Sequence, residues 1–230
     1  MRNTGSARGF WGLLDAPERA ILASKARHSS FAPGATICLQ GDPATHVFIL
    51  VSGWVKVVSV TSDGQELLVA LRGNGDVVGE MAGEVTGYRT ASIYAIGRVR
   101  SLVVSHERFG EFLDTHPAAG RAYRRTLTQR WTQTAQSLEV RSSTTGAQRL
   151  ARLLLELAEQ HGLDGEDGRD ETVIALPLSQ QELASLVSTS RATVTRAFGD
   201  WRRRKLIRTG QRRVAIIDTA ALRRIAGLRP

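Results

Sequence analysis

The sequence predicts an α+β fold in which a β-rich N-terminal region, a long helix and a small basic domain follow one another along 230 residues. Three observations indicate this fold class. Short apolar runs alternate with Gly and Asp between residues 31 and 105, apolar residues recur at helical spacing after Pro117, and helix-capping signals coincide with clustered positive charge beyond residue 172. With 42% hydrophobic and 23% charged residues, the composition is that of a globular protein and excludes a collagen-like or wholly disordered chain.

The β-rich region follows a segment, residues 11–27, whose apolar residues have helical spacing. Its predicted strands are short runs rich in Val, Ile and Leu: Thr36–Leu39, Val47–Val51, Val55–Val60, Leu67–Leu71, Thr90–Ala95 and Arg100–Val104. Asp63-Gly64 lies between two of these runs and is a hairpin signal. Strands with this spacing and punctuation favour an antiparallel sandwich or barrel.

The segment from Pro117 to about Val140 is expected to form one long helix, with Pro in its first turn. An a/d seam of the kind that pairs two helices runs along it through Leu127, Trp131, Thr134 and Leu138. A helix buried within a single chain is the alternative that two heptads leave open. Thr134 is unusual in either case, because a hydroxyl stands where an apolar side chain would pack better.

A break at residues 142–146 predicts a hinge, followed by an amphipathic helix over 147–161 and an acidic loop over 164–171. We therefore expect three parts: a domain over residues 10–116, a dimerisation helix and hinge over 117–145, and a C-terminal domain over 146–230.

The formal net charge of +9 comes entirely from the last quarter of the chain. Residues 172–230 hold twelve Lys and Arg against three acids, whereas residues 1–171 carry nineteen of each sign. A segment so one-sided repels itself unless a polyanion neutralises it, and nucleic acid is the usual polyanion. A basic face that merely keeps the protein in solution is the alternative.

Two helices are predicted within this basic segment. Ser179 and Glu182 form a capping box before one apolar-periodic stretch, and Ser190 can cap a second helix after a turn of about three residues. This spacing is typical of a helix-turn-helix. Val194, Ala197, Phe198 and Trp201 would form the buried stripe of the second helix. Beyond it, two apolar runs flank Gly210-Gln211 and predict a hairpin wing.

The outer face of the second helix, near its N-terminus, is the part that enters a major groove in such motifs. Arginine there offers a bidentate fork that matches guanine, while arginines around the wing are placed for phosphates. The predicted DNA-binding residues are Ser190, Arg191, Thr193, Thr195, Arg196, Arg203 and Arg212.

Residues 79–91 read Gly-Glu-Met-Ala-Gly-Glu-Val-Thr-Gly-Tyr-Arg-Thr-Ala. This segment resembles the phosphate-binding cassette of the CRP/FNR family of bacterial transcription regulators, written Gly-Glu-(Leu/Met)-Ala followed by Arg-(Ser/Thr)-Ala. The motif Ser190-Arg191-x-Thr193-Val194-x-Arg196 follows in the family's order, so the resemblance covers about residues 10–218. It implies an N-terminal β-roll (a double-stranded, cupin-like β-helix) that binds a cyclic nucleotide, a long dimerisation helix and a C-terminal winged helix-turn-helix.

The implied effector is cyclic AMP or a related cyclic nucleotide, and the implied binding residues are Gly79, Glu80, Met81, Arg89, Thr90 and Thr134. Gly79 would let the backbone approach the phosphate, and Arg89 and Thr90 would bind that phosphate. Glu80 would accept from the ribose 2′-hydroxyl, and Thr134 lies where the family's cyclic AMP receptors contact the adenine amino group. An ion pair between Arg89 and Glu80, and a role for Thr134 in setting the register of the helix pair, are the plainer alternatives.

The resemblance also implies partners: a second copy of the chain, double-stranded DNA with a palindromic operator, and RNA polymerase. Ala192 replaces the Glu of the family's cyclic AMP receptors, so their half-site is not implied. Ser188 replaces the Gly that is frequent in the interhelical turn, which would cost roughly 1 kcal/mol if the residue is left-handed.

The absence of certain residues and motifs from the sequence argues against several classes of protein. Cys38 is the single cysteine, which excludes an intramolecular disulfide or a cysteine-held iron–sulfur cluster. The Cys38 side chain is expected to lie in the core. The five histidines show no metal-site or haem spacing, and no enzyme motif is present. No apolar run is long enough to cross a membrane, so a cytoplasmic protein without a membrane partner is expected. A regulator with another effector or none, and a nucleotide-binding module that does not read DNA, remain alternatives.

Overall fold

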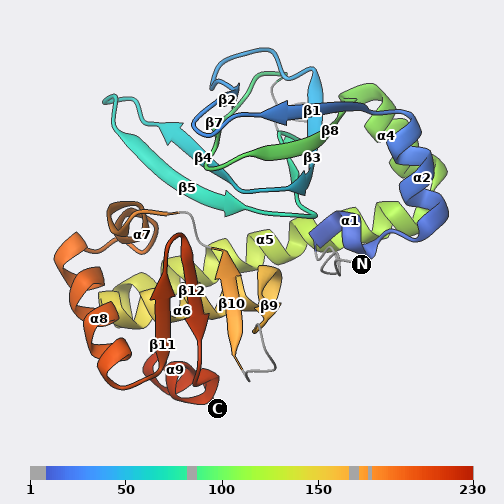
Figure 1. Ribbon diagram of the computed structural model, residues 1–230. Coiled ribbons are helices and arrows are strands. Elements are labelled where there is room, and N and C mark those ends of the chain that lie inside the picture. Colours follow the sequence, from blue (N-terminus) through green and yellow to red (C-terminus); the bar gives the residue numbers. More distant parts are fainter. Residues whose placement is uncertain (1–8, 82–86, 166–170, 176–177, 230) are drawn as a thin grey trace. The chain divides into compact units, whose positions relative to one another are not determined.

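The computed structural model describes residues 9–81, 87–165, 171–175 and 178–229, except for the side chains of 133–143, 160–161 and 175. These residues fall into two compact units, residues 1–132 and 133–230. The predicted α+β class is confirmed, with a β-rich first unit and a second unit of helices around a small sheet (Figure 1). No described helix is both long and apolar enough to span a bilayer.

The first unit contains two four-stranded antiparallel sheets that face each other (Figure 1). One sheet has the order β1 (Arg27–Phe31), β8 (Val99–Ser105), β3 (His46–Ser52) and β6 (Val77–Val78). The other has the order β2 (Thr36–Cys38), β7 (Ser92–Ala95), β4 (Val55–Val60) and β5 (Glu66–Arg72). This is the predicted β-roll, and β4 and β5 form the expected hairpin with Gly64 at φ 81°.

The continuous apolar run of β3 is explained by burial on both faces of the strand. Phe48 and Leu50 point into the core between the sheets, which also contains Cys38 as expected. Val47 and Ile49 point the other way, into a core shared with helices. Because successive strand residues alternate between faces, only an apolar residue at every position suits such a strand.

The helices of the first unit cover the outer face of the β3 sheet. They are α1 (Gly9–Leu13), α2 (Ala16–Ser24), α4 (His106–Thr115) and α5 (Pro117–Ser143). The segment 11–27, whose apolar residues have helical spacing, forms two helices, because Asp15 separates α1 from α2 and caps α2 in a capping box with Glu18. Leu127 of α5 packs partly into this core, while Trp131 is 76% exposed.

In the second unit, the end of α5 is followed by α6 (Gly146–His161), whose N-cap is Thr145 in the predicted hinge. The helix-turn-helix consists of α7 (Gln180–Leu186) and α8 (Arg191–Arg203), followed by α9 (Thr219–Ile225). Its antiparallel sheet has the order β11 (Ile207–Gly210), β12 (Arg213–Ile216), β10 (Thr172–Ala175) and β9 (Leu163–Asp164). The acidic segment is therefore not wholly a loop, since Leu163–Asp164 pairs with β10.

The wing is formed by β11 and β12, but its turn is displaced by one residue from the prediction. Gly210 pairs with Arg213 as the last rung of the hairpin, which leaves Gln211 and Arg212 as the turn. Arg212 has φ 55°, so the residue at the tip of the wing is a left-handed arginine.

Candidate functional site

The first candidate site is the cassette, residues 79–91, of which 79–81 and 87–91 are described. Gly79 has φ 79°, and a Cβ atom there would lie 2.5 Å from Nη1 of Arg89. Arg89 donates from Nη1 to the carbonyl oxygen of Gly79 and from Nη2 to that of His46, both at 2.7 Å. Glycine at position 79 is therefore required twice, for its backbone conformation and for the close approach of the guanidinium.

Arg89 is only 5% exposed, and its charge has no carboxylate partner among the described residues. Its Nε is buried without a hydrogen-bond acceptor in that part of the chain. The guanidinium carbon lies 5.5 Å from the centre of the Phe48 ring, which shields one side. Among the described residues this buried cation is held only by neutral groups, which is costly, and an anionic ligand would offset that cost. The arrangement fits a bound phosphate.

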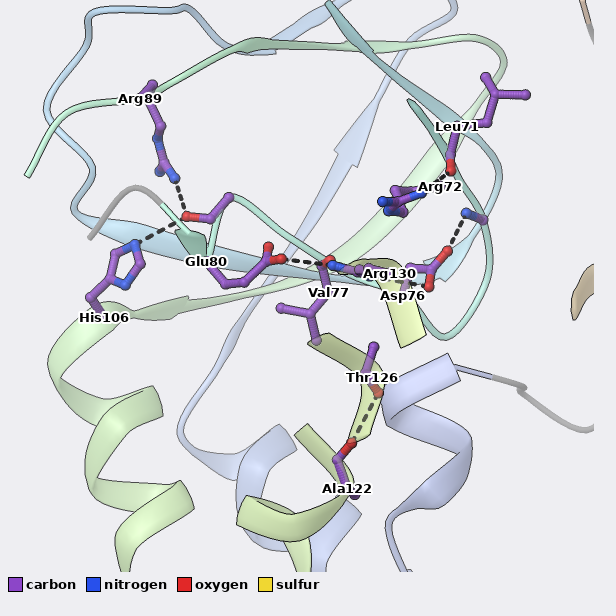
Figure 2. Close-up of polar contacts among 12 residues, drawn as sticks. Leu71, Arg72, Asp76, Val77, Glu80, Arg89, His106, Ala122, Thr126 and Arg130 are labelled. Carbon is purple, nitrogen blue, oxygen red and sulfur yellow. Dashed lines mark hydrogen bonds and ion pairs between the residues drawn. The ribbon is translucent and has the colours of Figure 1, made fainter. Parts of the chain in front are cut away.

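Glu80 is paired with Arg130 of α5 rather than with Arg89 (Figure 2). The Glu80 Oε1 to Arg130 Nη1 distance is 2.7 Å, and Glu80 is 4% exposed. Nη2 of Arg130 also reaches Asp76 Oδ1 at 3.3 Å and the carbonyl oxygen of Val77 at 2.9 Å. The alternative of an Arg89–Glu80 ion pair is therefore wrong, and the buried carboxylate of the cassette is held by the long helix instead.

Arg130 is a site residue that the sequence reasoning missed. It lies fifty positions from Glu80 in the chain, so no local spacing connects the two residues. Arg72 lies nearby and is partly buried: its burial and the charge of Arg130 lower the pKa of Arg72 to about 10. His106 Nε2 lies 3.2 Å from the same Gly79 carbonyl oxygen that Arg89 contacts, and it was not singled out either (Figure 2).

The other predicted effector residues are placed less closely. Met81 and Thr90 are both exposed. Thr134 belongs to α5, but its side chain lies outside the described residues. The structure thus brings Gly79, Glu80 and Arg89 together.

The second candidate site is the helix-turn-helix. Ser179 and Glu182 form the predicted capping box of α7, and Ser190 caps α8 by accepting from the backbone N–H of Thr193 at 3.1 Å. Four apolar residues form the buried face of α8, as predicted: Val194, Ala197, Phe198 and Trp201. The opposite face near the N-terminus of α8 is therefore left to solvent.

Of the predicted DNA-binding residues, Arg191, Thr195 and Arg196 are exposed on that free face. Thr193 is partly buried, with its hydroxyl 2.9 Å from that of Ser190, so both are engaged in capping. The Thr195 hydroxyl donates to Gln180 Oε1 at 2.6 Å, which brings α7 into the same surface.

Two further predicted residues, Arg203 and Arg212, lie at the far end of α8 and at the wing tip. The Arg203 side chain is 75% exposed and is 3.4 Å from Asp200. Arg208 of the wing is bound to Glu171 at 2.6 Å, a pairing that the sequence did not indicate. The arginines of this region therefore differ in how freely they can reach a phosphate.

Comparison with known proteins agrees with both sites. Residues 28–116 match the cyclic nucleotide-binding domain family, and residues 148–225 match the Crp-like helix-turn-helix domain family. A CRP-like cAMP-activated global transcriptional regulator of Mycobacterium tuberculosis is 31% identical over 90% of this chain and 91% of its own length. A global nitrogen regulator of Synechococcus elongatus is 33% identical over 84% and 86%.

Among solved structures, a CRP-family transcriptional regulator from Thermus thermophilus superposes with a TM-score of 0.67. It is 27% identical and is matched over 87% of this chain and 97% of its own. Identity of this extent across both domains establishes common descent, and proteins of this kind are regulators rather than enzymes. The chain belongs to the CRP/FNR family of transcription regulators.

Proposed function

We propose that this regulator is a homodimer whose DNA binding is controlled by a cyclic nucleotide, with cyclic AMP as the effector. The observation that carries the proposal is the buried Arg89 guanidinium, which has only carbonyl partners among the described residues and lies directly against Gly79. A cyclic phosphodiester carries a single negative charge, and arginine binds such groups through charge-assisted hydrogen bonds.

In the proposed complex, Arg89 and Thr90 bind the phosphate, and Glu80 accepts from the ribose 2′-hydroxyl. Arg130 holds the Glu80 carboxylate in place, since it is bound to Oε1. Gly79 and Met81 complete the cassette, and Thr134 receives the base. The relative from Mycobacterium tuberculosis, named as cAMP-activated, supports this choice of effector.

A second candidate is a regulator of the same build with another effector or none. It is favoured by the relative from Synechococcus elongatus, which is named for nitrogen regulation at a similar level of identity. In that case Arg89 would bind a different anion, and DNA binding would not depend on cyclic nucleotides.

On the DNA side, we propose that α8 reads base edges through Arg191, Thr195 and Arg196, that Ser190 and Thr193 take part in DNA binding at its capped N-terminus, and that Arg203 and Arg212 bind phosphates. The exposed face of α8 beside an excess of positive charge supports these roles. Pairing of two copies along α5 would place two α8 helices on a palindromic operator in the cytoplasm, where RNA polymerase is the partner for regulation.

The decisive experiment is a calorimetric titration of the full chain with cyclic AMP and cyclic GMP. We expect saturable binding of cyclic AMP that Arg89→Ala abolishes. The matched control is Arg100→Ala, which removes an exposed arginine of the same unit whose Nε donates to the Ser52 hydroxyl. Absence of heat with both nucleotides, together with an unchanged melting temperature, would favour the second candidate.

A further inference from the structure

Arg149 is an arginine outside both sites, and each of its three guanidinium nitrogens donates to a backbone carbonyl oxygen. It lies in the first turn of α6, directly after the hinge. Nε donates to the carbonyl oxygen of Val187 at 2.7 Å, and Nη2 donates to that of Ser188 at 2.9 Å. Nη1 donates to the carbonyl oxygen of Thr144. One side chain thus connects the start of α6 with the turn of the helix-turn-helix.

The two carbonyl groups that accept hydrogen bonds from Nε and Nη2 lie at the end of α7 and at a residue with a strained backbone. Val187 is the C-cap of α7, where carbonyl groups carry the negative end of the helix dipole. Ser188 has φ 48°, a left-handed conformation that a non-glycine residue adopts at a cost. Because a guanidinium is planar and presents its donors in a fixed fork, it defines the relative orientation of two successive carbonyls in a way that an ammonium group does not.

A second contact holds the same turn from α6. A Cβ atom on Gly146 would lie 2.1 Å from the Thr189 hydroxyl oxygen and 3.2 Å from Cγ2 of Thr193. The first turn of α6 therefore lies directly against both the interhelical turn and the beginning of α8. Ser190, the N-cap of α8, follows Ser188 after a single intervening residue, so little chain remains to absorb a change in the turn.

We propose that Arg149 is a positioning residue for DNA sequence readout. It contacts no base itself; it fixes the Val187–Ser188 turn and thereby the direction in which α8 presents Arg191 to the major groove. This inference rests on the proposed role of α8 in reading bases. The inference gives α6 a role in DNA sequence specificity, although α6 lies outside the helix-turn-helix.

The test compares two duplexes bound by the full chain, with and without cyclic AMP. One duplex is selected by the unmodified protein from a randomised library, and the other is a scrambled duplex of equal length and composition. In Arg149→Lys, which keeps the charge and loses the fork, we expect affinity for the selected duplex to fall about tenfold, comparable with one lost base contact. Affinity for the scrambled duplex should stay within about twofold, because phosphate contacts are not moved.

Arg152→Lys is the matched control. Arg152 lies one turn further along α6, and its Nε donates to the carbonyl oxygen of Ala226, the C-cap of α9, at 2.7 Å. The same substitution there also removes a helix-end contact but leaves the α7–α8 turn alone. We expect it to lower the melting temperature without changing the ratio of the two affinities. An equal loss of that ratio in both variants would overturn the inference.

Two further variants keep the outcome decisive. Gly146→Ala pushes on the same turn through Thr189 and should also lower the ratio, so the inference stays testable even if Arg149→Lys does not fold. Arg191→Ala tests base reading by α8 directly. If Arg191→Ala lowers the ratio and neither turn variant does, the role of Arg149 is wrong; if Arg191→Ala leaves it unchanged, base reading itself fails.

Discussion

Ser188 has a backbone conformation that costs stability because the residue is not glycine. Its φ of 48° is suited to glycine, and its carbonyl is held by Arg149. We expect Ser188→Gly to raise the free energy of unfolding by about 1 kcal/mol, because the left-handed conformation no longer strains a side chain. Urea denaturation measures this. Ser185→Gly, three residues earlier on the exposed side of α7, should lower stability by roughly 0.5 kcal/mol, and a gain there would contradict the explanation.

Cys38 gives a second residue-scale prediction, because its thiol reports on the cassette. Burial raises the pKa of Cys38 above its usual value, while the nearby charge of Arg89 lowers it. Alkylation by iodoacetamide at pH 8 should therefore be slow in the folded protein and should accelerate as pH rises, since only the thiolate reacts.

A phosphate bound at Arg89 cancels part of that charge and should raise the pKa of Cys38 further. Cyclic AMP is then expected to slow alkylation, measured by mass spectrometry. The same nucleotide should have no effect on the rate in Arg89→Ala. Faster alkylation on adding cyclic AMP would contradict an anion beside Arg89.

The sequence could reveal those site residues that lie close together along the chain and form a motif. Gly79, Glu80 and Arg89 lie within eleven positions and follow a recognisable pattern. Arg130 acquires its role only when α5 packs beside β6, and nothing in its neighbours on the helix distinguishes it from a solvent-exposed arginine. A contact between distant segments has no local signal to detect.

The same distinction holds for whole elements. The stretches predicted at β3, β4 and β8 were confirmed because apolar runs between glycines are sufficient to indicate them. In contrast, β1 was missed: its sequence Arg-His-Ser-Ser-Phe is polar, and it is a strand only because it pairs with β8 along five residues. At β6, two residues are too few to show any period.

An ion pair of the wing, between Glu171 and Arg208, should have a measurable effect on DNA binding. Glu171 has a side chain only 5% exposed and holds Arg208 of β11, so this arginine is not free for a phosphate. We expect Glu171→Gln to increase affinity for a random duplex and to steepen the logarithmic salt dependence by about 0.9, the value for one more phosphate contact. Fluorescence anisotropy across a salt series measures both quantities.

Asp164→Asn on β9 is the control for this prediction. It changes the net charge by the same amount from an exposed position, and Asp164 is paired with no arginine among the residues that the structure describes. Its salt dependence should stay as in the unmodified protein. If both variants steepen it equally, general charge and not Arg208 is responsible.

At the scale of the whole molecule, α5 is the element that both units share. It contributes Arg130 to the first unit and continues to Ser143, three residues before α6 begins. The division between the units falls within this helix, after Thr132. An element that holds the cassette carboxylate and also leads to the DNA-binding unit is where dimerisation would be linked to ligand binding.

Trp131 is the residue of α5 at which the proposed dimer can be tested. It follows Arg130 and is 76% exposed, whereas Leu127, one turn earlier on the same predicted seam, is already packed in its own chain. Tryptophan is a frequent anchor of protein interfaces, because it buries a large apolar area when a partner covers it. We expect Trp131→Glu to convert the protein to monomers in sedimentation velocity.

The functional consequence follows from symmetry. A monomer keeps one α8 helix, so Trp131→Glu should weaken binding to a palindromic duplex while leaving binding to a single half-site nearly unchanged. Leu39→Glu, which places the same charge on another exposed apolar residue of the first unit (46% exposed), should leave both the dimer and the palindrome affinity intact. A Trp131→Glu protein that remains dimeric would show that α5 pairs through a different face, and the exposed indole would then need another partner.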